Sequence, residues 1–221
     1  MNNLSKFAPI LLAVLVLSSL GCHRKLKDFA AQANEVTVQV AVSGRPTVDL
    51  HESGPSSENL AGAIGDAVVA TASIAESVKT QKRLERVMNP AAIRQLAVDG
   101  AFDELSGGVP FAGSVAPQTD GLVQLQLDEY GIVQYNGGPT FYAQYNIQIF
   151  RAGDNKRVYR KNISCYDSEF YVPSTAFNLA GTLATIQYVS SMSDEELIAK
   201  IEASIDRCTT RVFSTMRRHA G

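Results

Sequence analysis

The sequence of 221 residues contains no tryptophan, only three histidines and three cysteines, and no excess of charge of either sign. Its net charge of −2 provides no basic surface field, which argues against nucleic acid as a partner. No group of His, Cys, Asp and Glu has the spacing of a metal-ligand set. We therefore expect neither a metal site nor a nucleic-acid interface.

Residues that could perform catalysis are also scarce. His23 and His219 lie near the two ends of the chain, and His51 lies in a polar segment without an obvious partner. No serine has the surroundings of a nucleophile elbow. The glycines between Gly107 and Gly113 follow a predicted helix and precede a predicted strand, the reverse of the order in a phosphate-binding loop. We expect no enzymatic activity and no cofactor.

An apolar run near the start of the chain is the first positive signal. Met1–Lys6 is polar with one positive charge, and Phe7–Leu20 is almost wholly apolar. The run is shorter than the ~20 apolar residues that a membrane-spanning helix needs. A charged start followed by an apolar core of this length is typical of an export signal.

The export signal ends in Leu17-Ser18-Ser19-Leu20-Gly21-Cys22, which resembles the lipobox of bacterial lipoproteins. Gly21 fits the small residue before the cysteine, whereas Ser19 stands where leucine is usual, so cleavage by ordinary signal peptidase stays an alternative. The resemblance implies that lipid on Cys22 holds the protein on a membrane. Because His23 is not the aspartate that resembles an inner-membrane retention signal, it implies the outer membrane, facing the periplasm.

These signals predict three segments. Residues 1–21 form a signal peptide, residues 22–34 a lipidated N-terminus and tether, and residues 35–221 a single domain. The basic stretch His23–Lys27 would favour anionic head groups, although a solvated tether is the preferred interpretation.

The periodicity of the domain predicts an α+β fold. Alternating apolar residues indicate strands, whereas spacings of three and four with capping residues indicate helices. The order is strand, two helices, three strands, helix, which predicts an antiparallel sheet of about four strands with helices packed on one face. In layout the chain resembles auxiliary lipoproteins of envelope transport and assembly systems. The strands are expected at 36–42, 123–128, 141–149 and 159–165, and the helices at 57–87, 90–105 and 194–212.

The remaining cysteines predict a disulfide. If Cys22 carries lipid, Cys165 and Cys208 are left as a pair in an oxidising compartment. Cys165 shares a strand face with Ile163, and Cys208 continues the apolar side of the last helix beside Ile205. Packing of that helix on the sheet would bring the two sulfurs together, although a pair of buried free thiols is the alternative.

Tyrosines are enriched in the strand block, and Tyr142 is the candidate surface contact because Gln144, Asn146 and Gln148 share its face. We therefore expect a membrane-anchored, non-enzymatic envelope lipoprotein that binds a protein partner in assembly or transport. The alternatives are a carrier of a small apolar ligand or lipid, and a hydrolase without a known motif. A large apolar cavity would favour the carrier, and a cleft joining His51 to a serine and a carboxylate would favour the hydrolase. A filled core with an exposed apolar or tyrosine patch would favour the partner-binding protein.

The leader generates the first prediction. Mass spectrometry of the purified protein should find diacylglycerol on Cys22, and Cys22→Ser should move the protein from the membrane to the soluble fraction. A mature N-terminus elsewhere, or a soluble wild-type protein, would contradict acylation.

Overall fold

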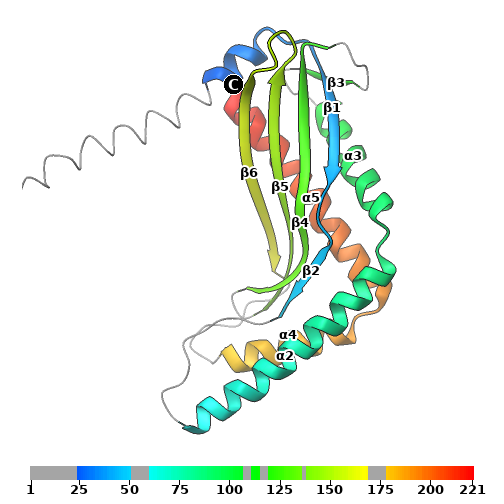
Figure 1. Ribbon diagram of the computed structural model, residues 1–221, viewed down its shortest axis with the longest axis vertical. Coiled ribbons are helices and arrows are strands. Elements are labelled where there is room, and N and C mark those ends of the chain that lie inside the picture. Colours follow the sequence, from blue (N-terminus) through cyan, green and yellow to red (C-terminus); the bar gives the residue numbers. More distant parts are fainter. Residues whose placement is uncertain (1–23, 51–59, 107–110, 115–118, 136–137, 169–177) are drawn as a thin grey trace, which may run out of the picture.

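The computed structural model describes residues 24–50, 60–106, 111–114, 119–135, 138–168 and 178–221 (Figure 1). Its core is one mixed sheet with helices packed on one face, an α+β fold. The strands run in the order β3-β1-β4-β5-β6, with β2 beside β4 on the same side as β1. Their bounds are β1 Glu35–Val42, β2 Pro46–Asp49, β3 Ala112–Ser114, β4 Gly121–Tyr135, β5 Gly138–Arg151 and β6 Arg157–Ser168.

The expected antiparallel sheet of about four strands is wrong in two respects. Strands β4, β5 and β6 are antiparallel, but β1 and β2 both run parallel to β4, and β3 runs parallel to β1. The parallel pairs arise because helices α2 and α3 lie between β2 and β4 in the chain. Such a helical crossover carries the chain back along the sheet, so that the next strand starts at the same end as the first.

The two strands absent from the prediction are short. Strand β2 contains Pro46 and lies in a segment interpreted as a loop, and β3 lies within the glycine-rich connection after the second helix. Strands of four and three residues are too brief to show a period of two. Asn136-Gly137-Gly138-Pro139 predicts a turn; Gly138 and Pro139 belong to β5, whereas residues 136 and 137 lie outside the described residues.

The helices agree more closely with the prediction. Their bounds are α2 Leu60–Val87, α3 Pro90–Ser106, α4 Asn178–Ser191 and α5 Asp194–Ala220. The Asn89 side chain caps α3 by accepting the Ala91 N–H at 2.9 Å. Ser193 and Glu196 form the predicted capping box of α5. Helix α4 carries no such signal and was not predicted.

Helix α5 packs along the inner face of the sheet and is the main covering element. Its apolar side is fully buried between β4, β5, β6 and helix α3. The buried hydroxyl of Tyr145 on β5 hydrogen-bonds the Thr209 hydroxyl on α5 at 3.0 Å. Burial raises the pKa of Tyr145 to about 12.

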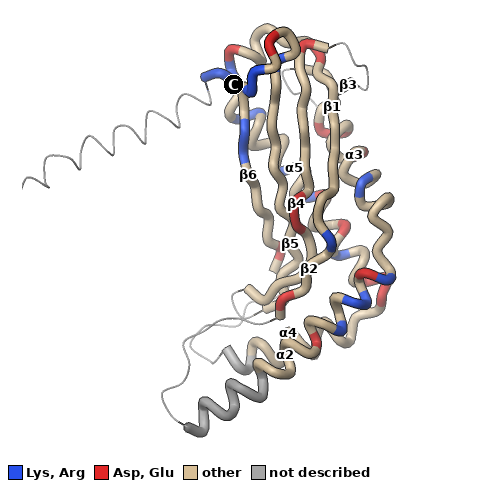
Figure 2. Tube along the Cα trace, viewed as in Figure 1, with Lys and Arg blue, Asp and Glu red and all other residues tan. Residues whose placement is uncertain are grey.

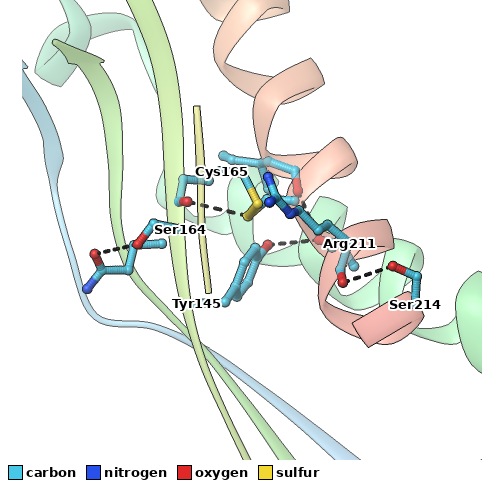
Figure 3. Close-up of a disulfide and its surroundings, with 10 residues drawn as sticks. Tyr145, Ser164, Cys165, Arg211 and Ser214 are labelled. Atoms are coloured by element: carbon cyan, nitrogen blue, oxygen red, sulfur yellow. Dashed lines mark hydrogen bonds between the residues drawn. A yellow bond between two sulfur atoms is a disulfide. The ribbon is translucent and has the colours of Figure 1, made fainter. Parts of the chain in front are cut away.

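The predicted disulfide fastens this helix to the sheet. Cys165 on β6 and Cys208 on α5 are joined, with their Cα atoms 5.5 Å apart (Figure 3). The bond closes a loop with a sequence separation of 43 residues. In the chain-entropy model, a crosslink that closes a loop of this size lowers the conformational entropy of the unfolded chain and thereby stabilises the fold by about 4 kcal/mol.

The first described residues form a helix instead of a tether. Residues 24–30 are helical, and Leu26 and Phe29 are buried. Lys27 Nζ donates to the Gly221 carbonyl at 2.7 Å, and the Phe29 ring contacts the Phe111 ring at 5.7 Å between centroids. This helix lies at the end of the sheet where β4 starts, which we call the proximal end; β4 finishes at the distal end.

A bend divides the sheet between these ends. Strand β4 has a bulge between Leu127 and Glu129, at the level where the chain passes from β1 to β2. Just beyond the bulge, Gly131 adopts a φ of +149°, and a Cβ atom there would lie 1.9 Å from the Thr47 carbonyl oxygen. Only glycine allows this close approach of β2 to β4.

Gly131→Ala should therefore destabilise the fold. We expect a loss of about 1–3 kcal/mol from the backbone conformation, with a further loss from displacement of Thr47. The matched control is Gly153→Ala, since a Cβ at Gly153 meets nothing within 4 Å. Urea unfolding followed by circular dichroism measures both variants, and equal midpoints would contradict the role of Gly131.

Candidate functional site

The catalytic histidine candidates do not come together. His219 Nδ1 hydrogen-bonds the Tyr159 hydroxyl at 2.9 Å, whereas His23 and His51 lie outside the described residues, as does Cys22. Within the described residues there is no cluster of His, Cys, Asp and Glu that could hold a metal ion. Across the same residues, no helix combines the length and apolarity needed to cross a bilayer.

The described residues between the sheet and the helices pack into one hydrophobic core. Buried side chains from the proximal helix through α5 form one continuous core. One crevice of ≈ 280 Å³ lies where the β1–β2 bend meets the α2–α3 junction, and Arg45, Glu85 and the buried Tyr130 line it. Its volume is at the lower end of the range of ligand pockets, roughly 300–1,000 Å³, and charged side chains contribute to its wall.

The outer face of the sheet, opposite the helices, is polar and largely uncharged in its middle. Amide and hydroxyl side chains form rows across β4, β5 and β6. Asn146 and Asn162 are hydrogen-bonded at 2.9 Å, and Ser164 donates to Gln144 at 3.1 Å. No helix of the described chain covers this face (Figure 1).

A stack of three tyrosine rings occupies the distal end of the outer face. The Tyr166 ring lies between Tyr135, with centroids 5.4 Å apart, and Tyr142, with centroids 6.1 Å apart. Tyr135 and Tyr166 are 49% and 52% exposed. These two tyrosines present ring area to solvent. The stack holds both rings in fixed positions.

The prediction that Tyr142 is a surface contact is wrong. Only 6% of Tyr142 is exposed, because Tyr166 covers one side of its ring and β2 lies beside it. Burial raises the pKa of Tyr142, and a hydrogen bond to the Thr47 side chain partly opposes that rise. The correct face was identified, but strand parity could not show that the neighbouring tyrosine lies outermost.

Exposed apolar side chains gather on the helices of the same end. Ile74 and Val78 on α2 are 57% and 49% exposed, and Leu183 on α4 is 47% exposed. Helices α2 and α4 pack together and extend past the sheet (Figure 1). We call the five exposed residues of this end, Tyr135, Tyr166, Ile74, Val78 and Leu183, the distal surface.

Polar contacts hold the two helices against the sheet. The Arg83 guanidinium binds the Asp194 carboxylate and donates to the Met192 carbonyl at 2.6 Å, which ties α2 to the α4–α5 junction. Hydrogen bonding by Arg83 lowers the pKa of Asp194. Gln134 at the end of β4 donates to the Thr182 hydroxyl on α4 at 2.9 Å. The helices and the tyrosine stack therefore belong to one connected end of the molecule.

Sequence analysis missed most of the distal surface. Leu183 lies on a helix that was not predicted, and Tyr135 and Tyr166 appeared only among many strand tyrosines. Ile74 and Val78 are four residues apart in a helix rich in small residues, a spacing that places both on one side. That helix was expected to pack on the sheet, whereas it contacts α4, α5 and the edge strand β2.

Comparisons with known proteins assign no family. No protein-family model matches the sequence, and no curated protein matches it significantly. Among solved structures, protein XCC0632 from Xanthomonas campestris has 9% identity, covers 85% of each chain and gives a TM-score of 0.36. PelC from Paraburkholderia phytofirmans has 10% identity over 71% of this chain and 90% of its own, with a TM-score of 0.33.

A third similar structure is lipoprotein GNA1162 from Neisseria meningitidis. Its identity is 16%, the match covers 72% of this chain and 99% of that chain, and the TM-score is 0.26. TM-scores and identities this low support no inference about activity or partner. The function therefore has to be argued from the residues of this chain.

The buried ring of Tyr142 and the half-exposed central ring of Tyr166 should differ in their contribution to stability. Tyr142→Ala removes a buried ring and should cost about 3 kcal/mol or more. Tyr166→Ala removes a half-exposed ring with two stacking contacts and should cost about 1–2 kcal/mol. Urea unfolding of both variants measures the difference, and a loss at Tyr166 as large as that at Tyr142 would show that Tyr166 is a core residue.

Proposed function

We propose that this protein is a lipid-anchored, non-enzymatic lipoprotein of the cell envelope that binds a protein partner through its distal surface. The observation that carries the proposal is the exposed, stacked pair Tyr135–Tyr166 at the end of the sheet remote from residues 24–30. Lipid on Cys22 would hold the proximal end at the membrane, on the periplasmic side of the outer membrane. The distal end would then be the part of the molecule most accessible to a partner.

The chemistry of the distal surface suits a protein. Tyrosine is enriched in protein interfaces because it combines a large apolar ring with a polar tip and few rotatable bonds. The rings of Tyr135 and Tyr166 are already ordered by stacking, so binding would cost little side-chain entropy. Ile74, Val78 and Leu183 add aliphatic area that is about half exposed.

The two alternative functions have less support. A carrier of an apolar ligand needs a large apolar cavity, whereas the crevice lined by described residues at the β1–β2 bend measures ≈ 280 Å³ and includes Arg45 and Glu85 in its wall. A hydrolase needs a nucleophile, a base and an orienting group within hydrogen-bond distance. His219, the histidine within the described residues, contacts Tyr159.

Site-specific photo-crosslinking in the native cell tests the proposal. A photoreactive amino acid at Tyr166 or Leu183 should give a discrete protein adduct in the membrane fraction. The control position is Gln39, which is exposed on the outer face but belongs to β1. Adducts of equal yield from Gln39, or none from either distal position, would contradict partner binding at this surface.

A matched pair of variants separates binding from stability. Tyr166→Ala combined with Tyr135→Ala should abolish the adduct formed at Leu183 while the protein stays in the membrane fraction. Tyr166→Phe keeps the stacked ring and should preserve the adduct. If the wild type and all variants are absent from the membrane fraction, this result contradicts the lipid anchor.

A further inference from the structure

Three segments that are far apart in the sequence meet at the proximal end. Lys27 of the first helix contacts Gly221 at the end of α5, and Phe29 lies against the start of β4 and the end of β5. The β5–β6 hairpin continues from there, and its residue Ala152 donates to the Asp120 carbonyl at 3.0 Å. Tyr159 on β6 contacts His219 on α5. Residues 24–30, 151–161 and 217–221 therefore form one end of the molecule, which we call the proximal cluster.

Basic residues are concentrated in the proximal cluster. It contains ten of the 20 Lys and Arg of the chain. Its three segments contain only two of the 22 Asp and Glu, Asp28 and Asp154, and within the described part of the chain Glu104 and Asp120 are bonded to it from neighbouring elements. Figure 2 shows blue segments gathered around the C-terminus, the first helix and the upper part of β6. A chain with a net charge of −2 thus carries a local excess of positive charge.

Internal ion pairs account for only part of this charge. Asp154 pairs with Arg151 and Lys156, and Glu104 pairs with Arg217. Asp120 accepts the backbone N–H groups of Asn34 and Glu35, which lower its pKa. The other basic residues of the cluster are exposed and have no ion-pair partner among the described residues. They are Arg24, Lys25, Lys27, Arg157, Arg160, Lys161 and Arg218.

The position of this charge relative to residue 22 identifies its occupant. Two residues of extended chain span roughly 7 Å, so a helix that begins by residue 24 starts within about one Debye length of any surface that holds Cys22. Positive charge at that distance attracts anionic lipid head groups. A basic surface could also attract an acidic protein, but the membrane is the surface that the anchor places against it.

We propose that the proximal cluster docks on an anionic membrane surface, so that the domain stands on the bilayer in a fixed orientation. The proposal rests on the lipid anchor of the proposed function for its geometry, but the docking surface has its own residues and its own test. Residues of β6 and of the α5 terminus contribute as well as the stretch beside Cys22. Orientation then depends on lipid charge, whereas retention on the membrane depends on the acyl chains.

The absence of tryptophan makes a direct test possible. Gly153→Trp places one fluorescent reporter at the hairpin of the proximal cluster, where a Cβ meets nothing within 4 Å. Tyr166→Trp places the same reporter at the distal end. Each full-length, processed protein is reconstituted into vesicles of brominated phosphatidylcholine, with or without phosphatidylglycerol, and quenching by the brominated lipid is measured after flotation.

The reporter at residue 153 should be quenched about twofold more on anionic than on neutral vesicles, because basic residues are drawn to charged head groups. About 1 M salt should remove the difference, since the Debye length falls to roughly 3 Å. Charge reversal by Arg160→Glu with Lys161→Glu should also remove it. Lys82→Glu, an exposed control on α2, should not, and the reporter at residue 166 should stay unquenched throughout.

Each outcome separates the two proposals. If the protein floats with both kinds of vesicle and its quenching does not depend on lipid charge or salt, the result supports the anchor and overturns the docking surface. Flotation with anionic vesicles alone would support the docking surface and contradict the anchor. Flotation with neither would contradict both. Equal quenching at residues 153 and 166 would overturn the fixed orientation.

Discussion

The packing of α5 on the inner face of β4, β5 and β6 is the interaction on which the rest of the structure depends. The helix is 27 residues long and contacts three strands and helices α2 and α3. The Cys165–Cys208 disulfide and the Tyr145–Thr209 hydrogen bond hold it at mid-length, and Arg83 fixes its start through Asp194. Gly221, which caps the end of the helix, accepts a hydrogen bond from Lys27 of the first helix. Loss of this packing would expose the sheet interior and separate both ends of the molecule.

Much of this core could be predicted because its elements are long and periodic. The alternation in β4, β5 and β6, and the capping box and apolar stripe of α5, all follow from side-chain geometry. The cysteine pair followed from parity and face. Strand direction could not be predicted, because it depends on where α2 and α3 return the chain. Strands β2 and β3 exist because they pair with β4 and β1, which are distant in the chain. Their own short sequences therefore show no alternating pattern.

The candidate sites were harder to predict than the core. Tyr142 and Tyr166 are direct neighbours across β5 and β6, and a sequence does not show which ring covers the other. The basic residues of the proximal cluster come from three distant segments, and the sequence suggested membrane contact only for the stretch His23–Lys27, where a solvated tether was preferred. The first helix is stabilised by tertiary burial of Leu26 and Phe29. A stretch of seven residues of mixed polarity is too short to show this burial as a helical pattern in the sequence.

Strand β6 is an edge strand of the sheet that the described residues form. Lys161 stands in the otherwise apolar parity of Tyr159 and Ile163, and a charge in that position discourages another strand from adding to the edge. The same residue contributes to the proximal cluster. Under the proposed docking, this one lysine would both protect the sheet edge and contact the membrane.

The length of β4 sets the distance between the proximal and distal ends of the sheet. Its 15 residues run from the proximal end to the tyrosine stack, and at about 3.3 Å per residue they span roughly 45–50 Å. Residues 24–30 are helical and provide no flexible spacer. A domain docked on the bilayer would therefore hold its exposed tyrosines at a nearly constant distance from the membrane surface. A partner confined to the head-group layer would pass beneath them. Under the proposed function, this geometry would favour a partner that itself projects several nanometres from the membrane, and it would confine the search for that partner to a thin layer.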